Sequence, residues 1–290
     1  MGIARRHEKE TKEGFMGIRL IAMDLDQTAL NREGRLSEHT QRVLEELLER
    51  GIQVVPASGR PLAAFPEDVM ALKGLQYAIA SNGTAIYHLP SNACLARFSL
   101  DPQIALDVLE LTKGLPVAHE FYIHGKAWAS RDYVEHPERY GAFGKTVAYI
   151  RATRSPFADA GEFLKRCGRD LDCMDVVAAE ESLKRRLMEI ISRRCRGVYV
   201  TTSDSRLIEI SNERAGKHRA LACLAAYLRI GAEGIAAFGD ADNDAEMLKS
   251  AGVGIAMGNA TPACREAADY VTRSHEEDGV AWGIREILGL

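Results

Sequence analysis

The chain has 290 residues, of which 46% are hydrophobic and 27% charged, and its formal net charge is −4 at pH 7. This length allows one large domain or two smaller ones, and it is sufficient to bury a core without disulfides. The composition excludes general disorder, and the lack of basic excess argues against a surface for nucleic acids or anionic membranes. No apolar run approaches the roughly 20 residues of a membrane-spanning helix.

The N-terminal segment is polar and rich in charge, and a second methionine, Met16, precedes the first apolar run. This segment lacks the apolar stretch of a secretory signal. We expect residues 1–16 to be a flexible extension, and a wrongly chosen upstream start codon would explain them equally well. The six scattered cysteines form no C-x-x-C pair, which is typical of reduced thiols and predicts a cytoplasmic protein.

The first part of the chain alternates strands and helices. A nearly all-apolar run over 18–24 predicts a strand buried on both faces, and a helix that Ser37 can cap follows it. Two further strands are expected over 52–57 and 77–81, with a helical stretch between them that Pro66 shortens or kinks. This β-α-β-α-β order predicts a parallel sheet covered by helices.

The pattern changes near residue 85, where short strand-like runs come in hairpin-like pairs with helices around them, and it returns after residue 205. The first strand of the returning pattern is expected at 206–210. We therefore predict a doubly wound, mostly parallel, Rossmann-like α/β core with an inserted α+β domain. The expected limits are 17–86 and 207–290 for the core and 87–206 for the insertion.

Two groups of carboxylates follow predicted strands. Asp24 and Asp26 stand two residues apart in an extended segment, so both can face one pocket. One could then act as nucleophile or metal ligand while the other exchanges a proton, although a solvated turn would also explain the pair. The run 240–244 offers hard oxygen ligands that suit Mg²⁺. An acidic helix N-terminus would give the same run.

Two further segments could bind an anion. Ser58 and Gly59 follow the second strand and precede a helix start, which suits an oxyanion but is also a common turn. Lys217 begins a helix, where its charge opposes the helix dipole unless an anion lies nearby. A surface lysine is the simpler alternative.

Together these segments resemble the haloacid-dehalogenase-like superfamily of phosphatases. The matching motifs, in chain order, are Asp24-x-Asp26-x-Thr28, Ser58, Lys217 and Gly239-Asp240-x-x-Asn243-Asp244. The inserted domain resembles, in position and length, the cap of the Cof-type (IIB) branch, and Ser81-Asn82-Gly83-Thr84 is similar to that branch too. Three positions depart from it: Gln27 and His218 replace Gly, and Ser58 replaces Thr. Gln27 in place of Gly raises a question about the shape of the loop that follows Asp26.

The resemblance implies a Mg²⁺-dependent phosphatase that hydrolyses a small phosphorylated metabolite, such as a sugar phosphate, through an aspartyl-phosphate intermediate. Asp24 would be the nucleophile and Asp26 the acid and base. The other implied roles are phosphate binding by Ser58, Gly59 and Lys217, metal binding by Asp24, the backbone carbonyl of Asp26, Asp240 and Asp244, and support from Thr28, Arg60, Asn82 and Asn243.

Two alternatives remain open from the sequence. A phosphoryl transferase or mutase of the same superfamily would pass the phosphoryl group to an acceptor other than water. A non-enzymatic sensor of phosphorylated ligands would not need the second acid of the Asp24 and Asp26 pair. We expect a monomer or weak homodimer with no nucleic-acid or membrane partner. No residue of the inserted domain carries a readable signal for the substrate.

Overall fold

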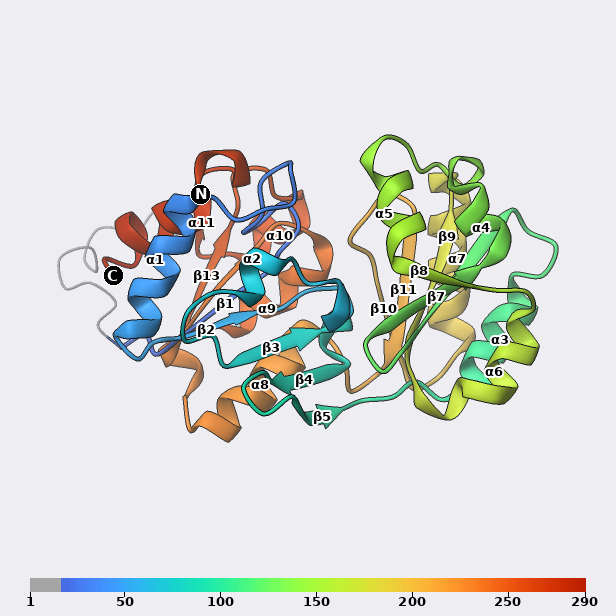
Figure 1. The fold of residues 1–290 in the computed structure, drawn as a ribbon, viewed down its shortest axis with the longest axis horizontal. Helices are drawn as coiled ribbons and strands as arrows, with labels where there is room; N and C mark the ends of the chain where they lie inside the picture. The colour runs from blue at the N-terminus through green and yellow to red at the C-terminus, as the bar shows by residue number, and fades with distance from the viewer. Residues whose placement is uncertain (1–16) are drawn as a thin grey trace.

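The computed structural model describes residues 17–290, so the predicted N-terminal extension, residues 1–16, lies outside the described residues. The chain forms two bodies side by side, which Figure 1 shows. The first, the core, contains a five-stranded parallel sheet in the order β14-β13-β12-β1-β2. Its strands are β1 (Leu20–Met23), β2 (Gln53–Pro56), β12 (Ile235–Gly239), β13 (Val253–Ala256) and β14 (Tyr270–Val271).

The core is built from both ends of the chain. Leu20 of β1 lies opposite Ile235 of β12, so two segments more than 200 residues apart form the middle of one parallel sheet. Helix α1 packs against α11, whereas α9 packs against α8 and α10, and these two groups cover the sheet. The helices are α1 (Glu38–Glu49), α2 (Glu67–Met70), α8 (Lys217–Leu228), α9 (Ala245–Ser250), α10 (Pro262–Ala267) and α11 (Gly279–Trp282). The predicted doubly wound core is confirmed.

The strand expected at 77–81 does not extend the parallel sheet. Strand β3 (Tyr77–Ala80) instead begins a three-stranded antiparallel sheet with β4 (Ala85–His88) and β5 (Ala93–Arg97). A single bridge between Ala57 and Ile79 joins it to the main sheet. The chain reverses here because Asn82 and Gly83 adopt left-handed backbone conformations, with φ of 53° and 85°.

The second body, the cap, contains a six-stranded sheet in the order β10-β11-β9-β6-β7-β8 and helices α3 to α7. All its strand pairs are antiparallel except β7 with β8. The strands are β6 (Val117–Ile123), β7 (Lys126–Ser130), β8 (Arg154–Phe157), β9 (Leu171–Ala178), β10 (Val198–Thr201) and β11 (Leu207–Asn212). The helices are α3 (Pro102–Leu111), α4 (Arg131–Glu135), α5 (Lys145–Thr153), α6 (Ala160–Cys167) and α7 (Glu181–Arg194).

The strand expected to mark the return to the core belongs to the cap. Strand β11 pairs antiparallel with β9 and β10, and its Ile208 and Ile210 pack in the hydrophobic cluster of the cap. A short apolar run has the same composition in either kind of sheet, so the sequence cannot distinguish them. The residue limits of the two domains stay a prediction.

Each body has its own hydrophobic interior. One cluster of buried side chains draws only on residues 18–87 and 220–288, and the others only on residues 100–210. Within residues 17–290, no buried cluster combines side chains from core and cap. The core and the cap are therefore stabilised by separate sets of buried apolar side chains.

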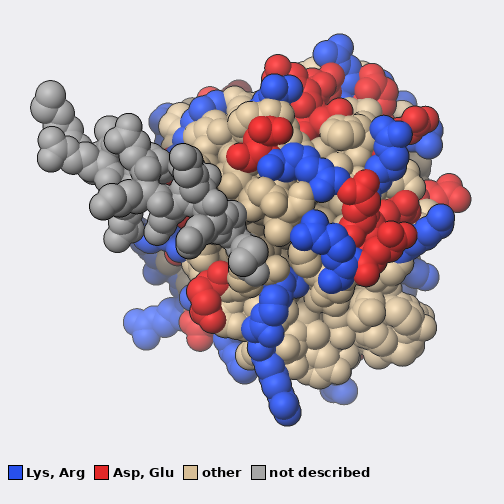
Figure 2. All heavy atoms as spheres, turned by 90° about the vertical axis from the view of Figure 1, so that its left-hand side faces the viewer, with Lys and Arg blue, Asp and Glu red and all other residues tan. Residues whose placement is uncertain are grey.

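The core face on the side away from the cap carries acidic and basic side chains interspersed with one another, as Figure 2 shows. Among residues 17–290, no helix is long and apolar enough to span a bilayer.

Candidate active site

The carboxyl ends of three parallel strands meet at the edge of the core sheet that faces the cap. Asp24, Ser58 and Asp240 follow β1, β2 and β12 within two residues. All three line one cavity of about 480 Å³, and cap residues form its other walls. Asp26 and Gly59 line the same cavity.

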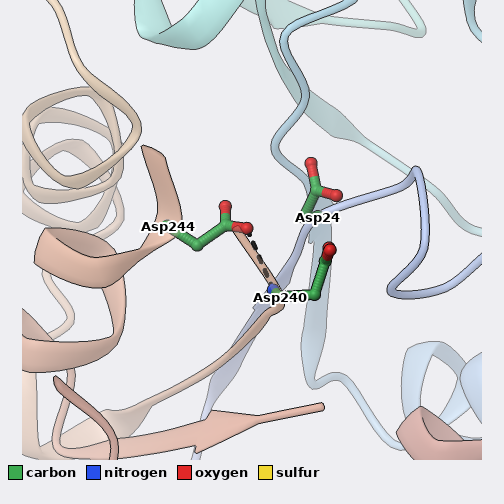
Figure 3. A group of neighbouring side chains, drawn as sticks. All are labelled: Asp24, Asp240 and Asp244. Atoms are coloured by element: carbon green, nitrogen blue, oxygen red, sulfur yellow. Dashed lines mark hydrogen bonds between the residues drawn. The ribbon is translucent and has the colours of Figure 1, made fainter. Parts of the chain in front are cut away.

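Three buried carboxylates form a cluster at this edge. Asp24, Asp240 and Asp244 each offer an oxygen, and these oxygens lie within 4.8 Å of one another (Figure 3). Asp244 Oδ2 accepts hydrogen bonds from the backbone N–H groups of Asp240 and Ala241, both at 3.1 Å. A Cβ on Gly239 would stand 2.4 Å from Cβ of Asp244, so this close turn requires glycine.

Lys217 provides the positive charge of the cluster. Its Nζ donates to Asp24 Oδ1 at 2.6 Å and to Asp244 Oδ1 at 2.7 Å, and its side chain is 1% exposed. Burial alone would lower the lysine pKa, but the two carboxylates outweigh it and hold this pKa above its usual value. Lys217 therefore stays charged, and it contacts carboxylates of two separate motifs.

One lysine does not balance three carboxylates. Burial, together with the neighbouring acids, raises the pKa of Asp24 well above its usual value. Burial and the charge of Asp244 raise the pKa of Asp240 to about 7, although Thr28 Oγ1 donates to its Oδ1 at 2.7 Å. Such a site is short of positive charge, and its hard oxygen donors fit a divalent cation.

Asp26 lies outside this cluster. Its side chain is 51% exposed and accepts two hydrogen bonds from Arg60, Nε to Oδ2 at 2.7 Å and Nη2 to Oδ1 at 2.6 Å. The Arg60 guanidinium also lies 5.1 Å from the ring centre of Tyr149 on α5. Arg60 therefore links Asp26 to the cap.

The loop that carries Asp26 has the shape that glycine favours. Gln27 has φ of 61°, in the left-handed region. A non-glycine residue there costs roughly 1–2 kcal/mol. Gln27 therefore holds a backbone conformation that glycine would adopt without this cost.

Of the remaining predicted residues, Ser58 and Asn243 line the cavity, and Asn82 contacts Asn243. Ser58 Oγ accepts a hydrogen bond from the Arg60 N–H at 3.2 Å. Asn82 Oδ1 accepts from Asn243 Nδ2 at 3.0 Å, and Asn82 Nδ2 donates to Glu209 Oε1 of the cap at 2.8 Å. Asn82 therefore joins the loop of residues 240–244 to the cap.

The sequence reasoning missed Glu209. The only signal was its position as the single polar side chain in the apolar run Leu207–Ile210. Glu is rarely buried unless it is paired, so an acid in such a run is an exception to the expected pattern and indicates a specific polar contact.

The sequence model of the haloacid dehalogenase-like hydrolases matches residues 21–284. The chain belongs to this family. The hydrolase is 31% identical over 268 residues to the 5-amino-6-(5-phospho-D-ribitylamino)uracil phosphatase YcsE of Bacillus subtilis, which covers 92% of this chain and 95% of that protein. It is 32% identical over 248 residues to the HMP-PP phosphatase of Enterobacter sp., with 84% and 85% covered.

Solved structures agree with the fold. A haloacid dehalogenase-like hydrolase from Bacillus subtilis superposes with a TM-score of 0.79 at 25% identity, covering 93% of this chain and 100% of that one. A subclass IIB sugar phosphatase gives a TM-score of 0.76 at 18% identity, with 93% and 98% covered, and this likeness concerns the fold alone. The predicted family and the predicted core with an inserted cap are confirmed.

Proposed function

We propose that this hydrolase is a Mg²⁺-dependent phosphatase that releases inorganic phosphate from a small phosphorylated metabolite. The observation that carries the proposal is a buried carboxylate, Asp24, held by a charged lysine and placed beside two further carboxylates in the wall of a cavity. The names of the two relatives above, both phosphatases of small phosphorylated compounds, support it.

Asp24 would be the nucleophile. Its carboxylate attacks phosphorus in line, the bond from phosphorus to the leaving oxygen breaks, and an aspartyl phosphate forms. The hydrogen bond that Lys217 Nζ donates to Asp24 Oδ1 fixes the orientation of the attacking carboxylate. Ser58 and Gly59, with Lys217, would hold the phosphoryl oxygens.

Asp26 would move the protons. It donates a proton to the departing alcohol, and it then removes one from the water that hydrolyses the aspartyl phosphate. The half-exposed position of Asp26 permits exchange of protons with solvent, and the two hydrogen bonds from Arg60 fix its direction. Arg60 is thus a positioning residue.

Asp24, Asp240, Asp244 and the backbone carbonyl of Asp26 would hold the metal ion. Bound Mg²⁺ offsets the repulsion between the anionic nucleophile and the anionic phosphate. Thr28 would support these ligands through its hydrogen bond to Asp240, and Asn243 would hold the loop of residues 240–244 through its hydrogen bond to Asn82. The cytoplasmic location and the monomeric or weakly dimeric state stay predictions.

The test compares Asp24→Asn with Asp26→Asn on p-nitrophenyl phosphate, whose leaving group departs without protonation. Asp24→Asn should form no phosphoenzyme. Asp26→Asn should release a burst of nitrophenol and then stop as phosphoenzyme, because hydrolysis of the aspartyl phosphate still needs a base. General base catalysis typically contributes about 10²–10⁴-fold to the rate of such a step. Stopped-flow absorbance and mass spectrometry of quenched protein measure both.

Covalent phosphate anywhere on the Asp24→Asn protein would contradict these roles. So would covalent phosphate on a residue other than Asp24 in the Asp26→Asn protein. Free phosphate and phosphoryl transfer to added alcohols are measured in the same reactions. Transfer in place of release would identify a transferase or mutase, and binding of phosphate esters without turnover would identify a sensor.

A further inference from the structure

Helix α5 places one aromatic side chain of the cap against the core. The helix lies on the side of the cap that faces the core (Figure 1), and its Tyr149 lines the same cavity as Asp24 and Asp26. The guanidinium of Arg60, in the core loop after β2, lies over the Tyr149 ring at 5.1 Å from the ring centre. Tyr149 therefore contacts the arginine that holds the side chain of Asp26.

The Arg60 guanidinium has a different kind of partner in each body. In the core, Nε and Nη2 donate to the two carboxylate oxygens of Asp26, and Nη1 donates to the carbonyl oxygen of Ala64 at 3.0 Å. A bidentate pair fixes the two groups relative to each other, so a tilt of the guanidinium would turn the carboxylate with it. In the cap, the partner is an aromatic ring, which attracts a cation within about 6 Å of its centre. The direction of Asp26 therefore depends on a contact from the cap.

Tyr149 is itself held inside the cap. The Arg154 guanidinium on β8 lies over the same ring, 4.8 Å from its centre. Arg154 is only 8% exposed and pairs with Glu120, Nε to Oε1 at 2.9 Å and Nη2 to Oε2 at 3.1 Å. Glu120 belongs to a row of three buried carboxylates, Glu120, Asp175 and Glu209, which lie opposite one another on β6, β9 and β11. The position of the ring is therefore tied to that of the cap sheet.

Five side chains thus form a continuous chain of contacts from the cap sheet to the proposed acid and base. In order, they are Glu120, Arg154, Tyr149, Arg60 and Asp26. The link between Tyr149 and Arg60 is the one that joins cap to core. It exists only while the cap is seated on the core, because separation of the two bodies takes the ring out of reach of the guanidinium.

The pair with Arg60 favours one protonation form of Asp26. An ionised carboxylate can accept from a guanidinium at both oxygens, whereas a protonated one carries a donor on one of them. Both oxygens of Asp26 accept from Arg60. Only the ionised form can remove a proton, so the chain of contacts holds Asp26 in the form that the second step of the proposed reaction needs.

We propose that Tyr149 is a positioning residue for hydrolysis of the aspartyl phosphate: through Arg60, it aims the Asp26 carboxylate at the attacking water. In this step the water gives its proton to Asp26 and its oxygen attacks phosphorus, the bond from phosphorus to the Asp24 oxygen breaks, and inorganic phosphate leaves. Tyr149 itself exchanges no proton. The inference rests on the proposed phosphatase function, because it concerns the second step of that reaction.

The test follows formation and decay of the phosphoenzyme separately, in single turnovers of p-nitrophenyl phosphate with Mg²⁺. Tyr149→Leu should form phosphoenzyme within about twofold of the wild-type rate, because this leaving group departs without protonation. Its phosphoenzyme should decay about tenfold more slowly, because a misdirected base loses part of its usual contribution of about 10²–10⁴-fold. The leaving group has departed before the decay, so a contact between Tyr149 and the leaving group cannot cause this difference. Rapid-quench mass spectrometry measures both rates.

Two further comparisons show whether the ring acts through Arg60. Tyr149→Phe keeps the ring and should restore decay to within about twofold of the wild-type rate. In an Arg60→Met background no guanidinium is left to position, so Tyr149→Leu should cause no further slowing of the decay.

Tyr140→Leu is the matched control. Tyr140 is also a tyrosine of the cap, but it packs edge-on against Tyr133, donates to Asp132 at 2.7 Å and does not line the cavity. Both rates of this variant should equal those of the wild type. Melting temperatures show whether each variant is folded, and Tyr149→Gln replaces Tyr149→Leu if the latter is not.

Decay at the wild-type rate in Tyr149→Leu would overturn the proposal, as would decay in Tyr149→Phe as slow as in Tyr149→Leu. Equal slowing of formation and decay would assign Tyr149 a general structural role instead. Slowing that persists in the Arg60→Met background would remove Arg60 from the path. A failure of the proposed function looks different, because the wild type itself would then form no phosphoenzyme on Asp24.

Discussion

Replacing Lys217 by methionine should destabilise the protein strongly and make its stability depend on a divalent cation. The substitution removes the bonds of 2.6 Å and 2.7 Å to Asp24 and Asp244, and the three side chains are 1%, 8% and 0% exposed. Loss of one partner from a buried ion pair costs about 3–5 kcal/mol. For a chain of this size, that lowers the melting temperature by roughly 6–20 °C.

Thermal unfolding in excess chelator and in saturating Mg²⁺ measures this effect. A divalent cation supplies the missing charge to the same carboxylates, so Mg²⁺ should raise the melting temperature of Lys217→Met more than that of the wild type. Lys184→Met is the control, because Lys184 is also buried but donates at 2.6 Å to a neutral acceptor, the carbonyl of Asp204. Its smaller loss, about 1 kcal/mol, should not respond to Mg²⁺.

Two results would refute this reasoning. One is a Lys217→Met protein that melts at the wild-type temperature in chelator. The other is a variant whose melting temperature responds to Mg²⁺ no more than that of the wild type. Either would mean that the lysine and the cation do not share the carboxylates of Asp24 and Asp244.

Three further predictions concern other parts of the structure. Burial lowers the pKa of His119 to about 4, from about 6.5 when unfolded, so the stability from its neutral form is complete above pH 6.5 and is lost as the pH falls toward 4. Up to about 3 kcal/mol of the change in the free energy of unfolding between these pH values should therefore disappear in His119→Gln. Urea unfolding of both proteins at pH 7 and pH 4.5 measures this change. Chelation should abolish hydrolysis, with Mg²⁺ restoring it and Ca²⁺ supporting little; full turnover in excess chelator would exclude the metal. Arg60→Lys keeps the charge but loses the two-pronged contact with Asp26, so steady-state kcat should fall about tenfold, and an unchanged value would remove Arg60 from its positioning role.

The core could be predicted because its signals are local. Each buried parallel strand is a continuous apolar run, and the polar residues that follow it must meet at one edge of the sheet. This is why Asp24 and Asp240 could be assigned to one site although they are more than 200 residues apart. Their chemical roles stay predictions.

The cap could not be predicted in the same detail. The row formed by Glu120, Asp175 and Glu209 depends on which strands pair and in which register, and no spacing along the chain records that pairing. The placement of β11 failed for the same reason. The contact of Arg60 with Tyr149 was also invisible, because it joins a loop of the core to a helix of the cap.

The separation of the two hydrophobic interiors determines how easily substrate can enter and leave. The described contacts across the boundary include Glu209 with Asn82, the ion pair of Arg97 with Asp172, and the ring contacts of Arg60 with Tyr149 and of Tyr199 with His218. They are polar or aromatic, and water can replace a polar partner when they part. A typical hydrogen bond contributes only about 0.5–1.5 kcal/mol net, whereas opening a shared apolar core would expose far more surface at about 25 cal/mol per Å². We therefore expect that the cap can part from the core without unfolding of either body, because the two share no hydrophobic interior among the described residues.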